Sequence, residues 1–221
     1  MINIAIDGPA GAGKSTIAKR LAKELGYIYV DTGAMYRAMA YYFLKNHISA
    51  EDENRIAAAC EHVDITIRYQ DGEQQVILNG ENVNGVIRNE EVGNMASSTS
   101  VYPVVRKKLV ELQQQLAVKE NVIMDGRDIG TVVLPDADVK IFLTASPEAR
   151  AQRRMLELEQ RGTPEPFEVV LKDIQERDWN DSHRAAAPLR QAEDAVLLDT
   201  TELTFAESEA ALLQIIKEKT K

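Results

Sequence analysis

Gly8, Gly13, Lys14 and Ser15 follow the pattern G-x-x-x-x-G-K-[ST] near the start of the chain. Glycines let the backbone wrap closely round an anion, so that its amide groups point at phosphate oxygens. Lys14 would reach the β- and γ-phosphates of a nucleoside triphosphate, and the Ser15 hydroxyl would ligate Mg²⁺. Because the pattern follows an apolar strand and opens a helical segment, we predict a phosphate-binding loop here.

Asp125, at the end of the apolar run VIMD, is the second candidate ligand for the metal. An aspartate in this position can also be an ordinary residue of the turn that follows a strand. The sequence contains neither a guanine-reading N-K-x-D nor a D-x-x-G. These absences argue against a GTPase switch.

Several arginines are placed to neutralise a second phosphate. Arg37 follows the run VDTG and Arg127 follows VIMD, so both are expected near the same crevice. Arg177, Asp181 and Arg184 continue the helical apolar stripe of Phe167, Val170, Leu171 and Ile174. Arginine suits this task because its planar fork binds phosphate through two hydrogen bonds.

The segment from 150 to 190 is rich in arginine and is predicted to close over the phosphates as a lid. For the charged end of the apolar stripe, at Arg177, Asp181 and Arg184, the alternative is a solvated helix end with internal Arg–Asp pairs. Arg153 is predicted to pair with Glu157 on its own helix. The arginines of the segment are Arg150, Arg153, Arg154, Arg161, Arg177, Arg184 and Arg190.

No general base is needed if the acceptor is a phosphomonoester, because such a group is largely dianionic at pH 7. The lack of an obvious catalytic histidine is then expected. His47, His62 and His183 have no metal-ligand spacing and are interpreted as incidental.

Short apolar runs alternate with helical patterns, which predicts an α/β fold. The runs cover 2–7, 27–33, 121–128, 139–146 and 195–201, and helical patterns cover 15–25, 102–119, 147–160 and 205–219. Such a parallel sheet is covered on both faces and binds ligands at the carboxyl ends of its strands. We therefore expect the P-loop NTPase fold, a five-stranded parallel sheet flanked by helices, in a single domain over 1–221.

Residues 63–83 break this alternation. They alternate apolar and polar side chains around two turn signals, Asp71-Gly72 and Asn79-Gly80. The pattern predicts a small antiparallel β meander. Because about 20 residues cannot hold a core of their own, we interpret it as an insertion in the domain.

Composition limits the classes of function. The net charge of −9 and the pI of about 5.0 argue against a nucleic-acid binder. The single cysteine, Cys60, cannot form an internal disulfide and is predicted to be a small buried side chain. No apolar run approaches the roughly 20 residues that span a bilayer, and the chain begins in a strand pattern without a signal peptide. We expect a cytoplasmic protein with no membrane partner.

Several stretches together resemble the bacterial cytidylate kinases, a family of nucleoside monophosphate kinases. They are GPAGAGKST, DTGAMYR, NEEVGNMASSTSVYPVVR, MDGRDIGTVVLPDADVKIFLTAS, RAQRRM and ERDWNDSHRAAAPL. The resemblance covers nearly the whole chain, including the insertion, which is typical of the bacterial cytidylate members. It implies ATP-dependent, Mg²⁺-assisted phosphorylation of CMP and dCMP by a monomer, with an acceptor-binding insertion at about 63–88 and an arginine-rich lid at about 150–184.

The resemblance also implies roles for individual residues. The implied catalytic residues are Lys14, Arg127, Arg177 and Arg184, and the implied metal ligands are Ser15 and Asp125. The implied ATP-binding residues are Gly8, Pro9, Ala10, Gly11, Ala12, Gly13, Lys14, Ser15 and Thr16. The implied CMP-binding residues are Thr32, Tyr36, Arg37, Ser97, Arg106, Arg127, Asp128, Arg177, Asp181 and Arg184. Thr32 stands where many members have serine and keeps the hydroxyl.

Within that set, Ser97, Arg106 and Asp128 match the residues that read cytosine. A carboxylate such as Asp128 can accept from the N4 amino group, and a donor such as Arg106 can serve N3 or O2. Uracil has the opposite donor and acceptor pattern at this edge. It would therefore leave buried polar groups unpaired, at a cost of about 1–3 kcal/mol each. UMP is therefore expected to be a poorer acceptor. Without the family, Asp128 reads equally well as a salt-bridging aspartate.

Two other functions fit the phosphate-binding loop. Another small P-loop kinase, of the shikimate or dephospho-coenzyme A type, would phosphorylate a hydroxyl and need a nearby base. A non-catalytic P-loop module would bind ATP tightly and turn over no acceptor.

Overall fold

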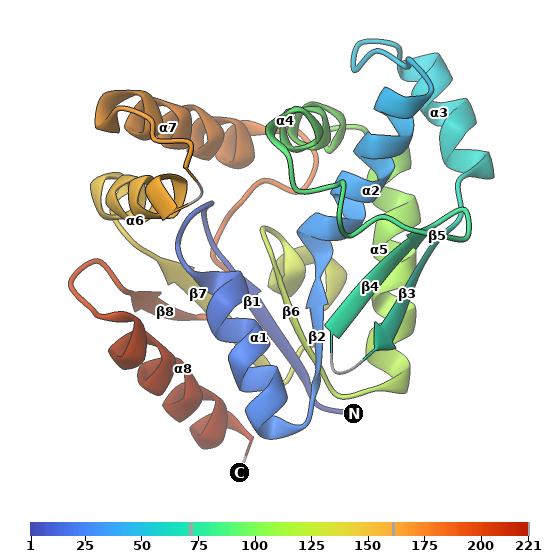
Figure 1. The fold of residues 1–221 in the computed structure, drawn as a ribbon. Helices are drawn as coiled ribbons and strands as arrows, with labels where there is room; N and C mark the ends of the chain where they lie inside the picture. Colours follow the sequence, from blue (N-terminus) through green and yellow to red (C-terminus); the bar gives the residue numbers. More distant parts are fainter. Residues whose placement is uncertain (71–72, 161, 221) are drawn as a thin grey trace.

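The computed structural model describes residues 1–70, 73–160 and 162–220, so the predicted Asp71-Gly72 turn and Arg161 lie outside the described residues. Its central layer is a five-stranded sheet in the order β2-β6-β1-β7-β8 (Figure 1). The strands are β1 (Asn3–Asp7), β2 (Ile28–Asp31), β6 (Val122–Gly126), β7 (Val139–Thr144) and β8 (Val196–Asp199). All their pairings are parallel, which confirms the predicted sheet.

Helices cover both faces of this sheet (Figure 1). They are α1 (Lys14–Leu25), α2 (Thr32–Lys45), α3 (Glu53–His62), α4 (Glu90–Thr99), α5 (Pro103–Lys119), α6 (Pro147–Gln160), α7 (Phe167–His183) and α8 (Phe205–Lys219). Side chains alternate along the buried strands, so that Ile4 and Ile6 pack toward α1 and α8 while Ala5 packs toward α2 and α5. The sheet is therefore buried on both sides, as parallel sheets are.

The helices α2, α3 and α4 were not among the predicted helical patterns. All three begin at a side-chain cap, because Asp31, Asp52 and Asn89 accept the N–H groups of Ala34, Arg55 and Val92. Cys60 lies buried in α3, as predicted. Within the described ranges, no helix combines the length and the apolar character needed to cross a membrane.

The insertion forms a separate three-stranded antiparallel sheet of β3 (Ile65–Gln70), β4 (Glu73–Leu78) and β5 (Glu81–Asn82). Asn79 and Gly80 both have positive φ, 48° and 87°, and make the predicted tight turn between β4 and β5. Gln74 ties this sheet to β2: its Oε1 accepts the N–H of Asp31 at 2.8 Å, and its Nε2 donates to the Asp31 carbonyl at 3.2 Å. The insertion is thus fixed beside the edge of the main sheet.

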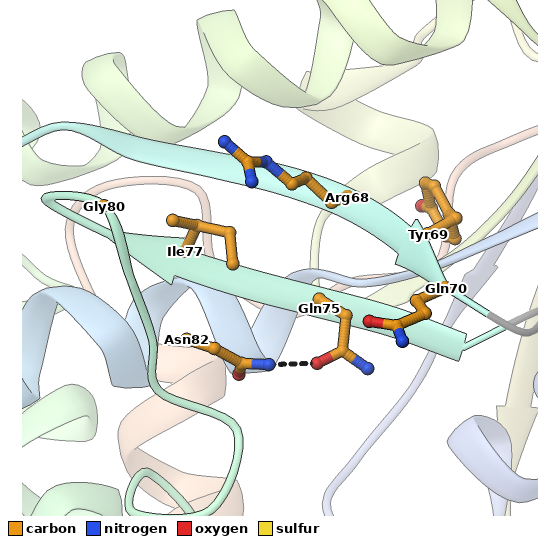
Figure 2. A pocket seen from close by; sticks show the side chains of 7 residues that line it. All are labelled: Arg68, Tyr69, Gln70, Gln75, Ile77, Gly80 and Asn82. Atoms are coloured by element: carbon orange, nitrogen blue, oxygen red, sulfur yellow. Dashed lines mark hydrogen bonds between the residues drawn. The ribbon is translucent and has the colours of Figure 1, made fainter.

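A hollow of about 440 Å³ lies on the small sheet, and Figure 2 shows the side chains that line it. The side chains of Gln75 and Asn82 are joined there by a hydrogen bond. The lining residues are Arg68, Tyr69, Gln70, Gln75, Ile77, Gly80 and Asn82. None of them is a predicted site residue.

The arginine-rich segment folds as the pair α6 and α7, which lie beside each other above the ends of the strands (Figure 1). Their shared apolar cluster contains the whole predicted stripe of α7, with Val170 and Ile174 buried. The predicted Arg153–Glu157 pair is wrong. Arg153 instead donates to the carbonyl of Thr200 at 2.6 Å, and Arg154 pairs with Glu157 at 3.0 Å. The guanidinium of Arg153 can reach the β8–α8 connection, while Arg154 points along the surface.

Candidate active site

The predicted phosphate-binding loop connects β1 to α1 at the carboxyl end of the central strand. Gly8 has a φ of +148°, and a Cβ there would lie 1.9 Å from the carbonyl oxygen of Leu143 in β7. Gly13 caps α1 with left-handed backbone, φ 88°. The glycines at both ends of the motif are therefore required by close approach and by backbone conformation.

Lys14, the first residue of α1, is buried at this loop. Its ammonium donates to the carbonyl of Pro9 at 2.7 Å, so it folds back across the loop. Burial, followed by the charge of Arg127, lowers the pKa of Lys14 to about 7. Asp125, Asp7 and Asp181 act to raise this pKa, and a phosphate group in the loop would add further negative charge beside the amine.

Ser15 and Asp125, the two predicted metal ligands, contact each other, although 110 residues separate them. The Ser15 hydroxyl donates to Oδ2 of Asp125 at 2.7 Å, and the Tyr29 hydroxyl donates to Oδ1 at 2.8 Å. Burial, followed by the charge of Asp31, raises the pKa of Asp125. Two adjacent oxygen ligands in a buried acidic setting fit Mg²⁺, which usually takes one or two protein ligands and completes its shell with water and phosphate.

Arginines gather beside this loop. Burial lowers the pKa of Arg37; the charge of Asp31 acts to raise it, and the charges of Arg88, Arg127 and Arg177 act to lower it further. Arg127 Nε donates to Asp181 at 2.6 Å, and this carboxylate outweighs burial and raises the pKa of Arg127. The structure therefore brings together the cations predicted to neutralise the acceptor phosphate.

Arg177 is exposed on α7, and its Nη2 lies 3.4 Å from Oδ1 of Asn94 on α4. Thr32 occupies the start of α2, where its hydroxyl donates to the carbonyl of Asp125 at 2.7 Å. Thus Thr32 supports the metal-side strand in this structure. Arg177 links the two helices that face each other above the site.

A buried charge cluster of Arg106, Asp128 and Arg184 forms the other side of the site. Arg106 Nη2 donates to Oδ2 of Asp128, and Arg184 Nη2 donates to Oδ1 at 3.3 Å. Burial raises the pKa of Asp128, although both arginines act to lower it. The cluster holds two guanidiniums and one carboxylate, so it contains both donors and an acceptor that a polar ligand could use.

Tyr36 is a predicted CMP-binding residue, and Ser97 is a predicted base reader. The ring of Tyr36 lies 5.7 Å from the guanidinium carbon of Arg106, and burial raises the Tyr36 pKa to about 12. Ser97 is exposed on α4. The residue that follows α4, Ser100, contacts the cluster, because its carbonyl accepts from Arg106 Nη1 at 3.5 Å. The structure places Tyr36 against the cluster and Ser97 one helical turn from this contact.

Sequence reasoning missed several contacts at the site. The Tyr29 hydroxyl donates to the Asp125 carboxylate, and strand alternation, which puts Tyr29 on the same face as Asp31, is the signal that could have found it. Arg88 pairs with Asp31 at 2.8 Å. Arg150 joins the lid to the loop: it donates to the carbonyl of Ala10 at 3.1 Å and binds Asp178 through two hydrogen bonds.

A β-strand leads into a glycine loop with lysine and serine, and a second strand ends in an aspartate. An arginine-rich pair of helices lies over both. Together these features define a P-loop phosphotransferase. The family model "Cytidylate kinase" matches residues 4–218. The chain belongs to the cytidylate kinase family.

Relatives extend this match over almost the entire chain. A cytidylate kinase of Caldicellulosiruptor bescii is 53% identical over 214 residues, covering 97% of this chain and 95% of the relative. Cytidylate kinases of Carboxydothermus hydrogenoformans and Lactobacillus johnsonii are 51% and 48% identical, covering 99% and 100% of this chain and 98% and 96% of theirs. An uncharacterized protein from Eubacterium ventriosum has a related fold, with a TM-score of 0.52 at 14% identity, over 100% of this chain and 99% of that chain.

Proposed function

We propose that the chain transfers the γ-phosphoryl group of ATP to the phosphate of CMP or dCMP, giving ADP and CDP or dCDP, and that UMP is a poorer acceptor. The observation that carries this proposal is the buried Arg106–Asp128 pair. Asp128 follows the carboxyl end of β6, and the phosphate-binding loop follows the carboxyl end of the neighbouring strand β1. A cytosine edge needs one acceptor and one donor, which this pair offers.

On the donor side, the amides of the loop and the Lys14 ammonium would hold the triphosphate. Ser15 and Asp125 would hold Mg²⁺, which supplies charge neutralisation at the β- and γ-phosphates when bound. Tyr29 fixes the orientation of the Asp125 carboxylate through its hydroxyl. Lys14 then gains its negative partner, so its proton is retained on binding.

On the acceptor side, Arg37 and Arg127 would bind the monophosphate, with Arg177 reaching it from the lid. The phosphate oxygen itself attacks, because it is already largely ionised at pH 7. These guanidiniums offset the repulsion between the two phosphate groups and hold the attacking oxygen in line. No side chain of this set has to remove a proton.

The lid residues would act after both substrates bind. Arg150 lies between the loop and α7, and its bonds to Ala10 and Asp178 give α6 and α7 a connection to the donor site. Closure of this pair would exclude water, which otherwise competes as an acceptor. The acidic pI and the single cysteine favour a cytoplasmic enzyme, and the family suggests a monomer.

The proposal is tested by measuring ADP release with ATP and Mg²⁺ across CMP, dCMP, UMP, AMP, GMP and shikimate. Fast turnover with CMP and dCMP, and slower turnover with UMP, is the expected result. Equal rates with AMP or GMP, or activity with shikimate alone, would mean that the acceptor site is misassigned. Tight ATP binding with no turnover of any acceptor would favour a binding module instead.

A further inference from the structure

Asp7, the last residue of β1, contacts a segment that lies more than 120 residues further along the chain. Its Oδ1 accepts the N–H of Ile129 at 2.7 Å, and its Oδ2 accepts the N–H of Gly130 at 2.7 Å. The side chain belongs to a residue that is only 4% exposed. Both carboxylate oxygens are thus committed to backbone amides inside the protein.

These two amides open η1 (Ile129–Val133), a single turn of π-helix directly after the base-reading aspartate. The first N–H groups of a helical turn have no partner within it and are usually capped by the preceding side chain. Here the preceding residue is Asp128, yet its side chain makes no capping bond. Its carboxylate bonds to Arg106 and Arg184 instead.

We propose that Asp7 is a positioning residue for acceptor selection: it caps η1 in place of Asp128 and so leaves the Asp128 carboxylate with Arg106 and Arg184, in the cluster that would face the base. This rests on the proposed function, since it takes Asp128 as the reader of cytosine. Without the Asp7 carboxylate, the uncapped amides of Ile129 and Gly130 attract Asp128, which then leaves Arg106. Asp7 directly precedes Gly8 of the phosphate-binding loop. The same residue therefore fixes the position of Asp128 relative to the loop that would bind ATP.

The test uses Asp7→Asn, which keeps the side-chain shape but sets an NH₂ group against one of the two amides. The ratio of kcat/KM for CMP to kcat/KM for UMP is expected to fall at least about fivefold, the effect of loosening one polar contact. The KM for ATP is expected to change less than about threefold, because the loop glycines remain. Asp138→Asn is the matched control, since Asp138 accepts the Asn3 amide at 2.7 Å from the opposite end of β1.

The outcomes separate this proposal from the proposed function. If the wild type shows no preference for CMP, or if Asp128→Asn leaves the ratio unchanged, the assignment of the base reader fails. If Asp128→Asn lowers the ratio but Asp7→Asn does not, the role of Asp7 is overturned. Parallel losses with CMP and UMP in Asp7→Asn would also overturn it, because a purely structural residue predicts an unchanged ratio.

If Asp7→Asn does not fold, Asp7→Ser carries the same measurement with a smaller side chain and a single acceptor oxygen. In the wild type, NMR couplings across the hydrogen bonds should connect the Ile129 and Gly130 amide nitrogens to the Asp7 carboxyl carbon. If those couplings are missing from otherwise assigned amides, the proposal is overturned whatever the variants do.

Discussion

Asp128→Asn tests base recognition with a change of a few atoms. In the structure the two carboxylate oxygens serve different arginines, Arg106 and Arg184. A carboxylate can only accept hydrogen bonds, so it favours the N4 amino group of cytosine and opposes the O4 of uracil. An amide offers one acceptor and one donor and can turn to suit either base. The substitution therefore removes one source of discrimination and leaves the contribution of Arg106.

The expected size of the effect follows from the burial of this contact. Asp128 is 5% exposed, so a mismatched partner cannot be rescued by bulk water. One unpaired buried polar group costs about 1–3 kcal/mol, which corresponds to a fall of about 5- to 150-fold in the CMP to UMP ratio of kcat/KM.

The assay sets CMP and UMP in competition in one reaction with ATP and Mg²⁺, and CDP and UDP are separated and counted. Their ratio does not depend on the fraction of enzyme that is folded. Asp138→Asn, an exposed aspartate far from the strand carboxyl ends, is the control and should leave the ratio as in the wild type. A ratio within about twofold of the wild type in Asp128→Asn would refute the assignment of Asp128 as base reader.

Three further changes probe the donor side. Because the Lys14 pKa is about 7 in the free protein, binding of Mg·ATP takes up a proton above that pH, and the affinity for Mg·ATP should fall about fivefold from pH 7 to pH 8. Calorimetry measures this affinity. An affinity that does not change with pH, or the same pH dependence in Lys14→Met, would contradict the prediction. Tyr29→Phe removes the hydrogen bond to Asp125. It should raise the Mg²⁺ concentration that gives a half-maximal rate by about fivefold and leave the preference between CMP and UMP unaltered. An unchanged Mg²⁺ requirement would count against the role of the hydroxyl. Gly8→Ala places a Cβ against the Leu143 carbonyl and should lower the free energy of unfolding by at least about 2 kcal/mol. Urea titrations followed by circular dichroism measure this free energy. A variant as stable as the wild type would show that the loop can shift.

Much of the fold could be predicted from local signals. The runs ending at Asp7 and Asp125 are continuously apolar, as strands buried on both faces must be, and the Asn79-Gly80 turn carries its own backbone preference. The helices α2 and α4 escaped prediction. Each mixes small and polar residues with apolar ones, because each faces the core on one side and the crevice on the other.

The candidate site was harder to predict where contacts join distant segments. Ser15 and Asp125 could both be predicted as metal ligands because Ser15 belongs to the glycine motif that follows β1 and Asp125 lies at the end of β6, and the structure brings them within a hydrogen bond. The bond from Asp7 to η1 has no such sequence signature, since an aspartate at a strand end is compatible with many turns. Likewise, Arg153 had a plausible partner one turn along its helix, but the Thr200 carbonyl, fixed by the fold beside α6, competes better.

The central claim is that the phosphate of a cytidine nucleotide accepts the phosphoryl group. Following a mixture of the protein, ATP, Mg²⁺ and CMP by ³¹P NMR tests it most directly, because the product phosphates are seen individually. The account predicts equal growth of the two coupled phosphate signals of CDP and the signals of ADP, with little inorganic phosphate. Loss of ATP to ADP and inorganic phosphate, with the CMP signal unchanged, would contradict it.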